Sequence, residues 1–63
     1  MSRKYAIRIK EEGALRDELH FTEQNSFSFA ASKAYNLCFD KVKETGKDWR
    51  IIEVIESFKN SKK

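Results

Sequence analysis

One amphipathic segment, residues 26–45, most constrains how this chain can fold, because it carries the only long helical pattern in the sequence. At about 100° per residue, its apolar face gathers Phe27, Ala31, Ala34, Cys38 and Val42. Small residues at the centre of such a face let a helix axis approach a sheet closely. Polar residues before the segment can cap its start, and Gly46 is placed to end it. The pattern predicts one helix packed on a sheet.

Two segments before this helix, residues 4–10 and 15–22, alternate between apolar and polar residues as strands do. The apolar sides consist of Tyr5, Ile7 and Ile9 in the first segment and of Leu15, Leu19 and Phe21 in the second. Gly13 lies between them and can supply the positive φ that a hairpin connection requires. We expect an antiparallel pair of strands.

The segment after the helix, Trp49 to Phe58, allows two interpretations. Ile51, Ile55 and Phe58 have helical spacing, and Asp48 could cap a helix there. The β-branched residues between positions 51 and 55 favour a strand. We predict a strand, with the helix as the open alternative.

These elements predict a single small α+β domain with the order ββαβ, an ordered core at about residues 4–58 and a basic tail at 59–63. A right-handed crossover places the strands in the spatial order 2-1-3, with the helix on one face. We expect that face to carry Tyr5, Ile7, Ile9, Leu19, Phe21, Ile52 and Val54. We expect the other face to carry Ala6, Arg8, Lys10, Glu18, His20, Trp49, Ile51 and Ile55. Apolar residues on both sides of the last strand would leave an exposed patch for something to cover.

No set of residues with the spacing of a catalytic or metal-binding motif is present, so we expect neither enzymatic activity nor a cofactor or metal. His20, the only histidine, is interpreted as a solvent-facing strand residue. Cys38, the only cysteine, lies on the apolar side of the predicted helix, where a thiol usually acts as a small hydrophobic group. A chain of 63 residues also has little room for a deep cleft.

The net charge of +3 conceals an uneven distribution. Residues 1–10 and 59–63 carry seven basic residues and no acidic one, whereas the middle holds the other six together with all ten acids. Basic ends can attract an acidic partner. No segment has the length and hydropathy of a membrane span or signal peptide, so we expect a cytoplasmic protein without membrane contact.

These features predict a non-enzymatic module that binds a larger protein and modulates or inhibits it. The candidate contact residues are Arg8, Lys10, Phe29, Trp49, Ile51 and Ile55. One alternative is a nucleic-acid-binding protein that uses the basic first strand and the open sheet face. Another is a homodimeric structural protein.

Four segments, YAIRIK, LHFTE, AASKAYNLCF and WRIIEVIES, give the chain a layout that resembles small phage host-takeover proteins. That family includes an inhibitor of bacterial RNA polymerase and an antitoxin that blocks a host ribonuclease toxin. The resemblance covers about 50 residues and assigns no functional residue. It implies a non-enzymatic protein that binds a larger host protein.

Overall fold

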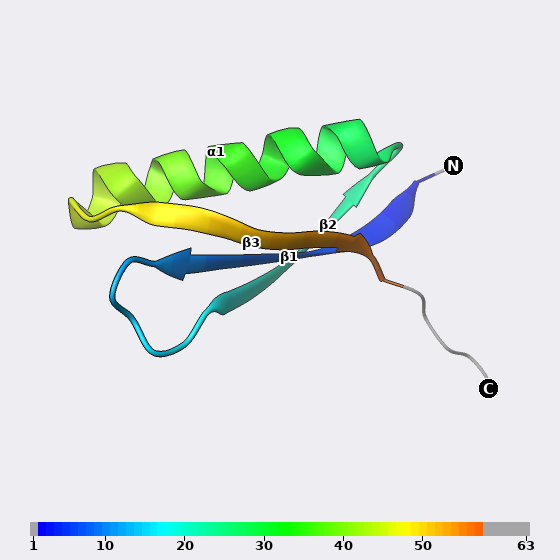
Figure 1. Ribbon diagram of the computed structural model, residues 1–63. Helices are drawn as coiled ribbons and strands as arrows, with labels where there is room; N and C mark the ends of the chain where they lie inside the picture. Colours follow the sequence, from blue (N-terminus) through cyan, green and yellow to red (C-terminus); the bar gives the residue numbers. More distant parts are fainter. Residues whose placement is uncertain (1, 58–63) are drawn as a thin grey trace.

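The computed structural model describes residues 2–57, which form a three-stranded sheet with one helix across one of its faces (Figure 1). The strands are β1 (Arg3–Glu11), β2 (Glu18–Gln24) and β3 (Trp49–Glu56), and the helix is α1 (Phe27–Thr45). β1 is central and antiparallel to both neighbours, in the order β2-β1-β3. The predicted α+β class, ββαβ order and strand order are therefore confirmed, and the last segment is a strand. The predicted tail and Phe58 lie outside the described residues.

Local sequence signals account for the ends of the helix. Ser26 has an extended backbone, and its hydroxyl accepts a hydrogen bond from the Phe29 N–H at 3.4 Å. At the other end, Gly46 adopts φ +74°, and its N–H donates to the Val42 carbonyl at 2.8 Å. Both predicted ends of the helix are confirmed. Gly13, in the β1–β2 connection, also has the expected positive φ, at +87°.

The buried core lies between α1 and the central strand. It consists of Tyr5, Ile7, Ile9, Ala30, Ala34 and Cys38. Because the helical members are small, the helix axis can lie close to β1. Ala34 and Cys38 of the predicted apolar face are buried, whereas Phe27 and Val42 are exposed and Ala30 is buried instead. Leu37, Trp49, Ile51 and Val54 pack around this core and remain partly exposed.

The face prediction for β2 was wrong. Ile7 pairs with His20 and Ile9 with Glu18, so the polar residues of β2 share the helix face with the isoleucines of β1. Leu19 and Phe21 instead point to the other face of the sheet. The cause is register, since shifting the pairing by one residue moves every side chain of a strand to the opposite face.

A β-bulge in β3 overturns the face prediction for Trp49, Ile51 and Ile52, whereas the predicted faces of Val54 and Ile55 are confirmed. Arg8 pairs with Glu53 and Ile9 with Ile51, so Ile52 is an extra residue without a partner on β1. The extra residue reverses the alternation, and Trp49 and Ile51 consequently lie on the helix face beside Val54. Apolar residues occur on both sides of β3 because one bulge interrupts the alternation of side chains between the two faces.

Candidate functional site: the open face of the sheet

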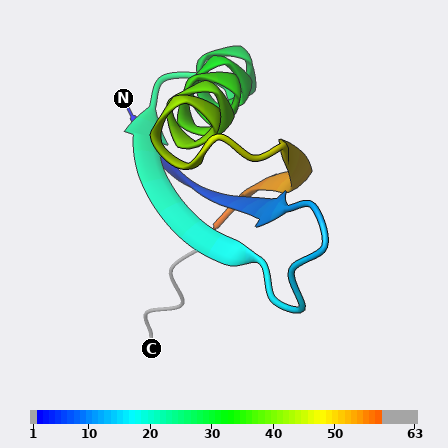
Figure 2. The same cartoon turned by 90° about the vertical axis from the view of Figure 1, so that its left-hand side faces the viewer.

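The face of the sheet opposite α1 is bare in the part of the chain that the structure describes (Figure 2). We call it the open face, and it carries Ala6, Arg8, Lys10, Leu19, Phe21, Arg50, Ile52, Glu53 and Ile55. Its large apolar side chains keep about half of their surface exposed: Leu19 50%, Phe21 56%, Ile52 47% and Ile55 46%. These side chains come from both outer strands, so strand pairing is what gathers them.

The register places the apolar side chains next to one another. Ala6 of the central strand pairs with Phe21 on one side and with Ile55 on the other, which makes a continuous apolar row across the three strands. Leu19 lies one step along β2 on the same face.

Arg8 lies next to this row and is largely neutralised. Its guanidinium is 3.7 Å from an Asp17 carboxylate oxygen and 3.6 Å from a Glu53 carboxylate oxygen. Arg8 is on the open face, as expected, but two acidic groups compensate its charge. It is therefore a weak candidate for a phosphate contact.

Lys10 and Arg50 form the basic end of the open face. They are paired residues on β1 and β3, and they line a shallow hollow of about 280 Å³ whose other lining residues are Glu11, Glu12, Gly13 and Ile52. Neither has an ion-pair partner among residues 2–57. The open face thus combines an apolar row with two cations at one end.

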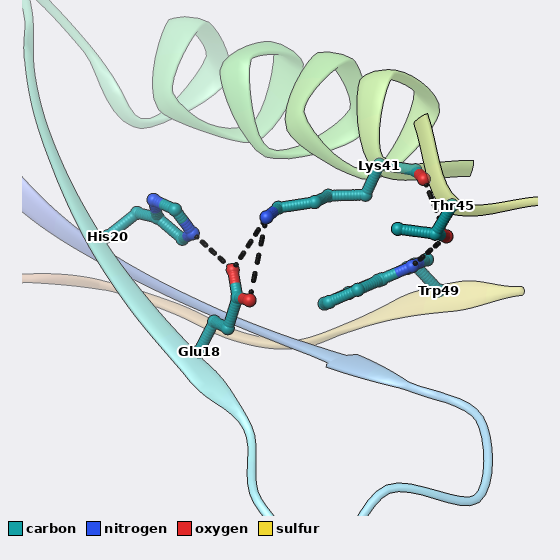
Figure 3. A network of polar contacts seen from close by, with 5 residues as sticks. All are labelled: Glu18, His20, Lys41, Thr45 and Trp49. Carbon is teal, nitrogen blue, oxygen red and sulfur yellow. Dashed lines mark hydrogen bonds and ion pairs between the residues drawn. The ribbon is translucent and has the colours of Figure 1, made fainter. Parts of the chain in front are cut away.

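Trp49 is held on the opposite face, under the end of the helix (Figure 3). Its indole N–H donates to the Thr45 hydroxyl at 3.1 Å, and that hydroxyl donates to the Lys41 carbonyl at 2.8 Å. The Lys41 ammonium lies 5.3 Å from the centre of the indole ring, a cation–π contact. These contacts hold the ring between α1 and β3, so Trp49 cannot contribute to the open face.

The same lysine links the helix to β2. Its ammonium lies 3.3 Å and 3.5 Å from the two carboxylate oxygens of Glu18, and the His20 ring contacts the same carboxylate at 3.0 Å (Figure 3). The hydrogen bond from His20, together with Lys41, lowers the pKa of the Glu18 carboxyl below its ordinary value. The prediction that Glu18 and His20 are on the open face was wrong. They help to hold α1 against the edge of the sheet.

The six candidate contact residues from the sequence do not form one group. Arg8, Lys10 and Ile55 lie on the open face, whereas Trp49 and Ile51 lie on the helix face. Phe29 is in the first turn of α1 and is 57% exposed, in the other layer of the molecule.

Sequence reasoning missed Leu19, Phe21, Ile52 and Arg50 as residues of the open face. Leu19 and Phe21 were assigned to the core because apolar residues usually face inward. The other side of β2 consists of polar residues, and this was the available signal. Polar residues suit the helix-facing side of an edge strand that the helix covers only in part.

Cys38 is buried in the core, where loss of hydration raises the pKa of its thiol. Residues 2–57 contain no group of three His, Cys, Asp or Glu side chains that could hold a metal ion. Over the same residues, no helix is long and apolar enough to cross a membrane.

Comparisons with known protein families, with curated proteins and with solved structures each found no match. The candidate site therefore depends on the geometry of this chain alone.

Proposed function

We propose that this protein is a small binding module that docks its open face onto an apolar surface of a larger protein. The observation that supports the proposal is the apolar row Phe21–Ala6–Ile55, extended by Leu19 and left uncovered by the helix. Contiguous exposed apolar side chains on a small domain are typical of protein interaction sites. Modulation or inhibition of that larger protein would follow from the docking.

The charges next to the row indicate what kind of protein surface would fit. Lys10 and Arg50 lie at one end, and neither forms an ion pair in the described part of the chain. A complementary partner would present an apolar patch with carboxylates beside it. Such charges direct orientation and increase the association rate more than they increase affinity.

Nucleic acid fits the same surface less well. Arg8 already contacts two carboxylates, and the indole expected to stack on bases lies under the helix. Among residues 2–57, Phe21 is then the one aromatic ring on the open face, whereas sheet faces that bind single strands usually offer several.

The test is affinity capture with the tagged chain from a cell lysate at near-physiological salt, with and without nuclease. Two variants decide the interpretation: Phe21→Ser on the open face and Phe29→Ser on the helix. They are matched because the two phenylalanines are exposed to a similar extent, 56% and 57%. We expect one protein to survive nuclease, to be lost with Phe21→Ser and to be retained with Phe29→Ser.

Other outcomes have definite meanings. Loss of the captured protein only with Phe29→Ser would move the binding surface to the outside of the helix. Capture that disappears on nuclease treatment would favour nucleic acid, and its steep weakening with salt would be the confirming sign.

A further inference from the structure

The free edge of β3 has the properties of a surface that pairs with a copy of itself. β3 runs along the front of the sheet in Figure 1, and no other described part of the chain pairs with its outer side. Edge strands of natural proteins usually carry features that discourage pairing, such as proline or a covering loop. β3 carries a bulge and three charged residues, yet its sequence WRIIEVIE has no proline and is rich in β-branched residues.

The bulge gives β3 a symmetric pattern of faces. From one end to the other, its residues alternate between partly buried and exposed, except that Ile52 and Glu53 are both exposed at the centre. The pattern therefore reads the same in both directions. In an antiparallel pair with a second copy, one register matches every helix-face residue with another helix-face residue. It places Trp49 opposite Glu56, Arg50 opposite Ile55, Ile51 opposite Val54 and Ile52 opposite Glu53.

The backbone hydrogen-bonding groups fit the same register. At the two ends of the β1–β3 ladder, the Glu12 N–H donates to the Asp48 carbonyl and the Ser57 N–H donates to the Lys4 carbonyl, each at 2.8 Å. Adjacent residues of a strand direct their N–H and C=O groups to opposite sides. Counting inward from these two ends therefore leaves the N–H and C=O groups of four residues on the free edge. They are Trp49, Ile51, Val54 and Glu56. The register pairs these residues only with one another.

A side of the helix adds apolar surface above this edge. Tyr35 is 70% exposed and lines a hollow of about 320 Å³ together with Trp49 and Ile51. Phe39 and Val42 are close to Tyr35 around the helix and are also exposed. A second copy related by a two-fold axis would bring its own helix to the same side of the joined sheet, where these residues could be covered.

We propose that two copies of this chain pair through antiparallel β3 edges and form one continuous six-stranded sheet. Both helices lie on one face, and the two open faces join into a single larger surface on the other. A two-fold contact must be self-complementary, and the symmetric pattern of β3 meets that requirement. This inference stands independently of any partner that the open face binds.

The first test is sedimentation equilibrium of the full chain over a concentration series up to about 1 mM. We compare Glu56→Pro, which removes an N–H from the free edge and none from the β1 ladder, with Glu56→Ala, which keeps that N–H. We expect a dimer that Glu56→Pro weakens about tenfold or more and Glu56→Ala preserves. Circular dichroism and urea midpoints at low concentration establish that both variants fold alike.

The second test reads the register directly by disulfide formation. Arg50→Cys combined with Ile55→Cys places cysteines opposite each other in the two copies, whereas Arg50→Cys alone leaves the introduced cysteines of the two copies about five residues apart along the joined strands. We expect oxidation to link the first variant into dimers and to leave the second largely unlinked. In the first variant the two introduced cysteines are too far apart along one strand to bridge within a chain.

Three results would overturn the proposal. One is a monomer throughout the concentration series, and another is a dimer that Glu56→Pro leaves intact. The third is equal linking of both cysteine variants, which would rule out the register. Phe21→Ser separates this proposal from open-face binding, because it should abolish partner capture and leave the dimer unchanged.

Discussion

Replacing Phe21 by alanine tests the position of β2 most directly, because the sequence pattern and the structure predict different costs. The ring keeps 56% of its surface exposed on the open face. Full burial of a phenylalanine side chain contributes about 1.5–3 kcal/mol, so a ring that is less than half buried contributes about 1 kcal/mol. A ring in the core under the helix would cost about 3–5 kcal/mol on truncation.

The assay is urea unfolding followed by circular dichroism at one low chain concentration, since self-association would add apparent stability. The control is Ile7→Val, which removes one methylene from a side chain with no exposed surface and should cost about 0.5–1.5 kcal/mol. We expect the loss of a whole ring at position 21 to cost about as much as the loss of that one methylene. A cost near 4 kcal/mol for Phe21→Ala would refute the register of β2 and the open face with it.

Two further predictions concern the contacts between the helix and the sheet. The pKa of Glu18 is lower in the folded chain than its ordinary value of 4.5, so its ionised form stabilises the fold above that pH, and this contribution is lost as the pH falls through the folded pKa. Unfolding midpoints at about pH 5.5 and pH 3 should therefore differ less for Glu18→Gln than for the unchanged chain, and an identical difference would contradict the contact with His20 and Lys41. Ala34 is packed against the sheet and has no exposed surface. The substitution Ala34→Leu should therefore overpack this contact and lower the free energy of unfolding in urea by about 1–3 kcal/mol. Introducing leucine on the solvent side of the helix, by Asn36→Leu, should change the stability by no more than about 0.5 kcal/mol, and equal costs would count against close helix–sheet packing.

The open face and the β3 edge would act together in the dimer. Pairing through β3 would double the apolar and basic groups presented on one side of the sheet, because both open faces would point the same way. A partner with two equivalent sites could bind both with an affinity above that of one site. Separate variants at Phe21 and Glu56 make the two properties independently measurable.

The sequence determined the elements, because their signals are local. The alternation Tyr5–Ile7–Ile9 is sufficient for a strand, and small apolar residues at helical spacing are sufficient for α1. Ser26 and Gly46 mark its ends by the backbone geometry that each side chain permits. Short connections and the handedness of the crossover then leave few possible arrangements, so the strand order could also be predicted.

Only the tertiary structure decided which residues form each surface. Leu19 and Phe21 face away from the helix because of their pairing with β1, and Trp49 and Ile51 face it because Ile52 is an extra residue in β3. A shift or an insertion of one residue leaves the alternating pattern of each strand almost unchanged, yet it exchanges the two faces. Register depends on contacts between segments far apart in the sequence, and no single segment encodes it.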